Sequence, residues 1–161
     1  MVNPICFIMI GLPGSGKSTV AESYAKKFNA DILSTDKFIE YQADWFGLTY
    51  NEAFNQFYPD AEKTFKLNVA NALKDKRNVI IDRTNLTLKR VKFVKRFTEA
   101  GFQVVYVLVE RSEDVLDKVN EERKKTGRHL SDEVRNRLKE SYIPPTIEEG
   151  AHKIVYVGDR Q

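Results

Sequence analysis

The sequence predicts an α/β fold, with a mainly parallel five-stranded sheet, helices on both faces and a small lid. The first observation is a continuous apolar run at 5–10 that leads through a glycine-rich turn into a helical pattern, as expected of a strand covered on both faces. The second is that apolar strands alternate with helical periodicities along the chain. The third is a polar, glycine-containing stretch at 124–129 between two later helical segments, where we expect the lid.

The individual elements follow from local patterns. Strands are expected at 5–10, 31–34, 78–82, 104–109 and 153–157. Helices are expected at 17–28, from Pro59 to Leu73, from Thr87 to Gly101, and near 112–124 and 131–142. Proline is tolerated in the first turn of a helix, so Pro59 is expected to begin one. The aromatic residues between 37 and 58 have helical spacing and are expected to pack in the core.

Composition restricts the class of protein. The 161 residues are 42% apolar and 30% charged, which fits one compact domain over 1–161 and excludes a disordered chain. No apolar run is long enough to span a membrane, and no segment has the pattern of a signal peptide. We therefore expect a cytoplasmic protein that does not bind membranes. Oligomeric state stays open.

Charge is concentrated in one segment. The formal net charge is +3, yet residues 74–96 contain nine lysines and arginines against two acidic residues. A basic segment of this kind can attract a polyanion such as nucleic acid, and it can equally be the solvated face of a helix.

The turn after the first strand matches the pattern G-x-x-x-x-G-K-[ST] in full. Its residues, with the threonine that follows, are Gly11, Leu12, Pro13, Gly14, Ser15, Gly16, Lys17, Ser18 and Thr19. Such a loop turns backbone N–H groups towards phosphates, its lysine reaches the β and γ phosphates, and its serine hydroxyl binds Mg²⁺. The sequence thus predicts a P-loop NTPase fold that binds ATP and Mg²⁺.

Two aspartates follow the next two predicted strands. Asp36 can act as the general base that accepts a proton from an acceptor hydroxyl, or it can cap a helix that begins at Lys37. Asp82 ends an apolar strand, as the metal-binding acid of P-loop proteins does. The residues after it, Arg83, Thr84 and Asn85, are expected to bind the acceptor in the same cleft, although a purely structural turn is an alternative.

The expected lid contributes cations. Arg123 and Arg128 are the candidates for closing over the transferring phosphoryl group, because a guanidinium fork matches phosphate oxygens. An ordinary solvated basic loop is the alternative.

Five segments resemble the P-loop kinases of the polynucleotide 5′-hydroxyl kinase type, which include phage polynucleotide kinases. They are GLPGSGKST at 11–19, STD at 34–36, VIIDRTNLT at 79–87, GRHLSDEV at 127–134 and PPTIEEG at 144–150. The resemblance implies a kinase that moves the γ-phosphoryl group of ATP to the 5′-hydroxyl of a polynucleotide. It also implies that Asp36 is the general base, that Lys17 and Ser18 bind ATP and Mg²⁺, and that the lid arginines lie over the phosphates.

Two positions depart from this family. Ile39 stands where some members have an arginine that contacts the acceptor, and Arg83 stands where asparagine is common. Arg83 either replaces the missing contact or signals a different acceptor. Other acceptors therefore stay open: a hydroxylated nucleoside, a nucleotide or a modified DNA base such as a hydroxymethyl pyrimidine. A non-catalytic nucleotide-binding module is the alternative from another class.

Overall fold

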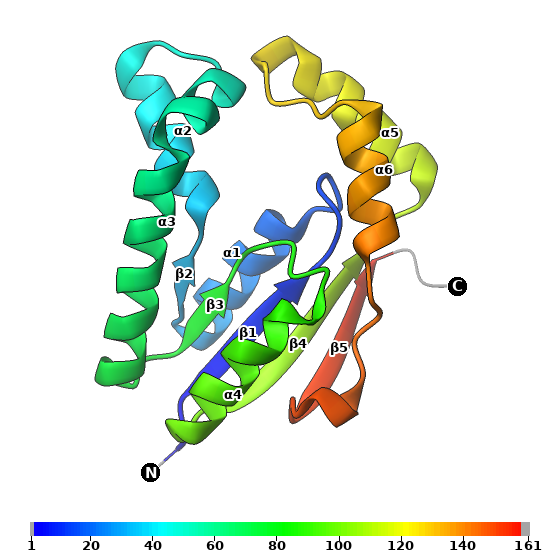
Figure 1. Cartoon of the computed structure of the whole chain (residues 1–161). Coiled ribbons are helices and arrows are strands. Elements are labelled where there is room, and N and C mark those ends of the chain that lie inside the picture. The colour runs from blue at the N-terminus through cyan, green and yellow to red at the C-terminus, as the bar shows by residue number, and fades with distance from the viewer. Residues whose placement is uncertain (1, 159–161) are drawn as a thin grey trace.

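The computed structural model describes residues 2–158 and has the predicted α/β architecture. Five parallel strands form one sheet in the order β2-β3-β1-β4-β5 (Figure 1). Because β1, β3 and β2 are neighbours, the loops that follow these three strands meet at one edge of the sheet. This order brings together the P-loop, Asp36 and Asp82.

The bounds agree with the predicted elements except around residues 35–75. The strands are β1 Ile5–Ile10, β2 Asp31–Leu33, β3 Val79–Ile81, β4 Gln103–Glu110 and β5 Lys153–Gly158. The α-helices are α1 Lys17–Phe28, α2 Thr35–Phe46, α3 Tyr50–Asp75, α4 Val91–Glu99, α5 Glu113–Arg123 and α6 Asp132–Ser141. Short 3₁₀ turns are η1 Leu88–Arg90, η2 Lys124–Thr126 and η3 Ile147–Glu149.

Helices cover both faces of the sheet, as buried parallel strands require. On one face α1 packs through Ala21 and Tyr24 against Phe7 and Met9 of β1. On the other face α3 and α4 pack through Phe65, Val69, Val94 and Phe97 against the opposite side chains of the same strands. The alternation along β1 thus divides the core into two layers, and the apolar run at 5–10 is buried on both sides.

The prediction that Pro59 begins a helix is wrong. Pro59 lies inside α3, which begins after Thr49 with a reciprocal capping box between Thr49 and Glu52. Proline removes the N–H that would bond to the carbonyl of Asn55, but both residues are exposed, so water can satisfy that carbonyl. The strong cap upstream therefore decides where the helix starts.

The aromatic residues between 37 and 58 are only partly in the core. The buried centre of the α2–α3 hairpin consists of Ile39, Ala43, Ala53 and Ala61, with Phe38, Tyr50 and Phe57 packed around it. Tyr41, Trp45 and Phe46 are exposed. Three of the four central residues are alanines, which leave little room between the two helices for a large ring. Within residues 2–158 no helix is long and apolar enough to cross a membrane.

Candidate active site

The P-loop connects β1 to α1 in a conformation that requires glycine. Gly16 caps α1 with a φ of 88°, a region that is costly for residues with a side chain. A Cβ at Gly11 would lie 2.7 Å from the carbonyl oxygen of Val109, so this position has no room for one. The loop is therefore closed around its own backbone N–H groups at the N-terminus of α1, an arrangement that binds phosphate.

The residues predicted to bind Mg²⁺ lie together. Ser18 Oγ donates a hydrogen bond of 3.3 Å to Asp82 Oδ2, and Asp82 is buried. Burial raises the pKa of Asp82, while the nearby Lys17 ammonium acts to lower it. A serine hydroxyl beside one carboxylate suits Mg²⁺, which uses few protein ligands and fills its other positions with water and phosphate oxygens. These two residues fit the predicted metal site.

Lys17 lies beside both carboxylates. Its Nζ donates to the carbonyl of Leu12 at 3.4 Å. Burial lowers the pKa of Lys17, whereas Asp82 and Asp36 act to raise it. The Ser15 hydroxyl is buried and has no hydrogen-bond partner among the described residues. A phosphate held in the loop would supply the partner that this buried hydroxyl lacks.

Asp36 does not cap a helix, so the alternative interpretation of this residue is wrong. Ser34 is the N-cap of α2, and its Oγ accepts the backbone N–H of Asp36 at 3.1 Å. The Asp36 carboxylate instead lies in the cavity, where Tyr50 donates to it at 2.5 Å and Arg128 pairs with it at 3.3 Å. A carboxylate held in this way is oriented for accepting a proton from a bound hydroxyl.

The loop after β3 is held by its own side chains. Asn85 has a φ of 48°, and its amide donates to the carbonyl of Met9 at 2.7 Å, while the Thr84 carbonyl accepts the N–H of Gly11 at 3.1 Å. These bonds join the loop directly to the P-loop. Arg83 pairs with Glu62 at 2.6 Å and lies over the Phe65 ring, with 4.9 Å from the guanidinium carbon to the ring centroid.

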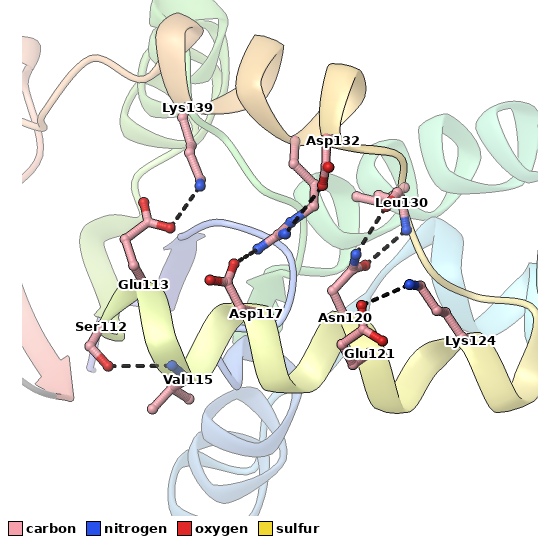
Figure 2. A network of polar contacts seen from close by, with 11 residues as sticks. Ser112, Glu113, Val115, Asp117, Asn120, Glu121, Lys124, Leu130, Asp132 and Lys139 are labelled. Carbon is pink, nitrogen blue, oxygen red and sulfur yellow. Dashed lines mark hydrogen bonds and ion pairs between the residues drawn. The ribbon is translucent and has the colours of Figure 1, made fainter.

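The lid is larger than the stretch at 124–129. It comprises α5, η2 and α6, and side chains bridge its two helices (Figure 2). The Asn120 side chain accepts from the N–H of Leu130 and donates to its carbonyl, both at 2.9 Å. Two ion pairs join α5 to α6: Asp117 pairs with Arg135, and Glu113 pairs with Lys139. These contacts make the two arms of the lid one packed unit.

The tip of the lid contacts the start of α3. Asn51 donates through its backbone N–H to the Gly127 carbonyl at 2.9 Å and through its side chain to the His129 carbonyl at 3.1 Å. A Cβ at Gly127 would lie 2.6 Å from that of Thr49, so only glycine allows this approach. The docked tip places Arg128 over the Tyr50 ring and in ion pairs with Asp36 and Glu40.

A cavity of about 600 Å³ lies between these elements and is called the active-site cavity here. Its walls include nearly all predicted site residues: Pro13, Gly14, Gly16, Lys17, Ser18, Thr19, Asp36, Asp82, Arg83, Thr84, Arg123 and Arg128. Gly11, Leu12, Ser15 and Asn85 are not among the lining residues. Arg123 lies close enough to Arg128 that burial and this like charge both lower its pKa. The cavity thus brings together the P-loop, the Ser18–Asp82 pair, the Asp36 carboxylate and the guanidinium groups of Arg123 and Arg128.

Three features of the site were not predicted. Tyr50, Phe54 and Tyr58 of α3 form a row of rings along one wall, with adjacent centroids 6.3 and 4.7 Å apart. Their i, i+4 spacing was visible but does not tell a cavity wall from a core. The bond from Asn51 to the lid and the buried pair of Arg90 with Glu149 join residues distant in sequence, and no local pattern indicates them.

The fold and the site together define a P-loop nucleotide-binding protein with a lid. The chain belongs to the family described as AAA domain (AAA_33), which matches residues 7–145. A shikimate kinase of Thermobifida fusca (strain YX) is 34% identical over 107 residues, which cover 64% of this chain. This chain spans only 57% of the length of that relative.

Solved structures have the same fold. A candidate kinase from Chloroflexus aurantiacus J-10-fl has a TM-score of 0.72 at 23% identity, covering 98% of this chain and 86% of that chain. A shikimate kinase of Acinetobacter baumannii, solved in complex with shikimate, has a TM-score of 0.56 at 14% identity, covering 96% and 84%. At these identities the likeness concerns the fold.

Proposed function

We propose that this protein is an ATP-dependent kinase that transfers the γ-phosphoryl group to an acceptor hydroxyl. The observation that carries the proposal is the position of Asp36, in the same cavity as Lys17 and Ser18. A protein that only binds nucleotide does not need a carboxylate on the acceptor side of its P-loop. The kinase names of the relatives support the same reaction class.

The residues divide the work between ATP and acceptor. Lys17 and the P-loop amides would hold the β and γ phosphates, and Ser18 with Asp82 would hold Mg²⁺. The bound metal would neutralise charge on the β and γ phosphates. Asp36 would accept the proton of the acceptor hydroxyl as its oxygen attacks the γ-phosphorus, and ADP would leave. Arg123 and Arg128 would stabilise the charge on the transferring group.

The acceptor we propose is the 5′-hydroxyl of a polynucleotide. The rings of Tyr50, Phe54 and Tyr58 line the side of the cavity where the acceptor would enter, and aromatic rings of this kind stack with nucleobases. Arg83 in the same wall offers a guanidinium to a phosphate.

A small hydroxylated carboxylic acid is the second candidate. It is favoured by the similarity to shikimate kinases, which extends over 107 residues. Arg83 would then pair with the carboxylate of the acceptor. A nucleoside, a nucleotide and a modified DNA base are further candidate acceptors for the same experiment.

The test is transfer of label from γ-labelled ATP in the presence of Mg²⁺. The acceptors are 5′-hydroxyl RNA and DNA oligonucleotides, nucleosides, DNA with hydroxymethylated bases, and shikimate. Lys17→Ala is the inactive variant, and Lys26→Ala on the exposed side of α1 is its matched control. Transfer to an oligonucleotide that disappears with Lys17→Ala supports the proposal. If only shikimate is phosphorylated, the acceptor is a small hydroxylated acid and not a polynucleotide. If no acceptor is phosphorylated although ATP binds normally, the protein is a nucleotide-binding module and not a kinase.

A further inference from the structure

A second cavity of about 570 Å³ lies beside the active-site cavity and is called the basic cavity here. It is formed by α3, the loop after β3, η1 and α4, with the end of α6 closing one side. In Figure 1 α3 and α4 stand on either side of β3. Phe65, which is buried, and Phe93 line it with their rings at a centroid distance of 6.0 Å.

Cations dominate its walls. The lining residues include six cations, namely Lys66, Arg83, Lys89, Arg90, Lys92 and Arg96, and one carboxylate, that of Glu62. Glu62 pairs with Arg83, and Arg90 pairs with Glu149. Within residues 2–158 the other four cations form no salt bridge. An excess of charge of one sign around a concave surface attracts ligands of the opposite sign.

Only some of the cations in residues 74–96 line the basic cavity. Residues 74–96 do not form one basic surface: Lys89, Lys92 and Arg96 line the cavity, whereas Arg77 pairs with Asp31 beside the start of β2. Lys66, which lies outside that segment, lines the cavity from α3. The fold therefore assembles the positive charge from α3, the loop after β3, η1 and α4.

The two cavities share part of their walls. Arg83, Thr84 and Leu138 line both of them. The row of rings ends at Tyr58, whose hydroxyl lies 3.3 Å from Nη2 of Arg83. A ligand with one end at Asp36 and its base against the rings can therefore continue past Arg83 into the basic cavity.

We propose that the basic cavity binds the phosphodiester groups of a single-stranded polynucleotide acceptor. If the reacting 5′-hydroxyl lies at Asp36, the rest of the strand runs in the 3′ direction, and its phosphates follow the reacting nucleotide. This inference rests on the proposed kinase function. A volume of this size accommodates about one drug-sized ligand, which corresponds to one further nucleotide and its phosphates. A small carboxylic acid would end inside the active-site cavity and would leave the four cations without a role.

The test measures binding without turnover. Oligonucleotides with a 5′-hydroxyl and a fluorophore at the 3′ end are titrated with the whole chain, and anisotropy gives the affinity at several salt concentrations. The variant is Lys89→Gln with Lys92→Gln. The matched control is Lys74→Gln with Lys95→Gln, which removes the same charge from exposed residues of α3 and α4 that line neither cavity.

We expect the cavity variant to bind at least ~10-fold more weakly and to lose about 1.4 from the slope of log affinity against log salt, which is two phosphate contacts at ~0.7 each. The control should bind as the unchanged protein does. The gain in affinity from a mononucleotide to a trinucleotide should disappear only in the cavity variant. Equal weakening by both variants, or an unchanged salt slope in the cavity variant, overturns the proposal.

The outcomes also separate this inference from the proposed function. Transfer to an oligonucleotide that neither variant affects would retain the kinase and remove the subsite. Binding that depends on the basic cavity, without transfer to any acceptor, would retain the subsite and remove the kinase. If pyrophosphate binds in the basic cavity and oligonucleotide length has no effect on affinity, the ligand of the cavity is a small anion. That result would overturn the proposal of a polynucleotide.

Discussion

Arg90 and Glu149 form a buried, bidentate ion pair that joins the loop after β3 to the turn before β5. Nε and Nη2 of Arg90 donate to the two carboxylate oxygens at 2.8 and 2.9 Å, and the Arg90 side chain is 0% exposed. Tyr106 donates to the same carboxylate at 2.8 Å, and Nη1 of Arg90 donates to the Asn85 carbonyl at 3.1 Å. The pair therefore fixes the far end of the loop that begins with Asp82.

Loss of this carboxylate should destabilise the protein strongly. Glu149→Gln leaves the Arg90 charge buried without its counter-ion, which costs about 3–5 kcal/mol of unfolding free energy. Urea denaturation measures the change. Glu148→Gln, on the exposed neighbour, is the control and should change stability by less than about 0.5 kcal/mol. Equal stability of the two variants would contradict a buried, energetically important pair.

The same pair predicts a pH dependence. Burial acts to raise the pKa of Glu149, but the hydrogen bonds from Arg90 and Tyr106 outweigh it and hold the pKa below its ordinary value. The stabilisation is therefore complete above the unfolded-state pKa of ~4.3 and is lost as pH falls through the lower folded value. The difference in unfolding free energy between the unchanged protein and Glu149→Gln should shrink below about pH 4.

Local sequence was sufficient where backbone geometry alone determines the structure. The P-loop pattern predicted the turn between β1 and α1, because only glycine adopts the φ of residue 16 without strain. The alternation of strands and helices predicted the parallel sheet, and the carboxyl ends of β2 and β3 then predicted that Asp36 and Asp82 would meet.

Contacts between distant segments could not be predicted in this way. Pro59 misled the prediction because a capping box at Thr49 outweighs a proline in an exposed turn. Ile39 is fully buried in the α2–α3 hairpin, so this position does not face the active-site cavity, whereas Arg83 does. Lys66 of α3 and Lys92 of α4 both line the basic cavity, although they lie on different helices.

Asp36→Asn should separate catalysis from stability. Because Ser34 caps α2, the substitution leaves the helix cap intact, and Arg128 keeps its pair with Glu40. We expect phosphoryl transfer to fall by ~10²-fold or more, since the amide cannot accept a proton, while the melting temperature changes little. Asp44→Asn, an exposed position on the same helix, is the control. A collapse of stability with normal activity per folded molecule would make Asp36 structural.

Asp82→Asn should weaken the use of Mg²⁺. Asp82 is buried beside Ser18, and loss of its charge should raise the Mg²⁺ concentration for half-maximal binding of ATP by ~10-fold or more. Calorimetric titration of ATP at several Mg²⁺ concentrations measures this without turnover. Asp60→Asn, at an exposed position of α3, should leave the Mg²⁺ dependence unchanged. A Mg²⁺ dependence of Asp82→Asn equal to that of the unchanged protein would remove Asp82 from the metal site.

Arg128 holds the carboxylate that we propose as the base, so its role can be tested against two opposite expectations. If it stabilises the charge on the transferring phosphoryl group, Arg128→Ala should lower kcat by ~10²-fold or more. If instead it only restrains Asp36, its removal should free the carboxylate and leave kcat unchanged or higher. We expect the first result, because the docked tip of the lid places this guanidinium at the active-site cavity together with Arg123.

Two further variants complete this test. Arg128→Lys retains the charge but loses the fork that can bind two phosphate oxygens, so it should recover only part of kcat. Arg137→Ala on the exposed side of α6 is the matched control and should retain full activity. Steady-state kinetics with ATP and the preferred acceptor give kcat and KM for each variant. A full recovery by lysine would assign Arg128 a simple positive charge, and an unchanged kcat in Arg128→Ala would remove it from the reaction.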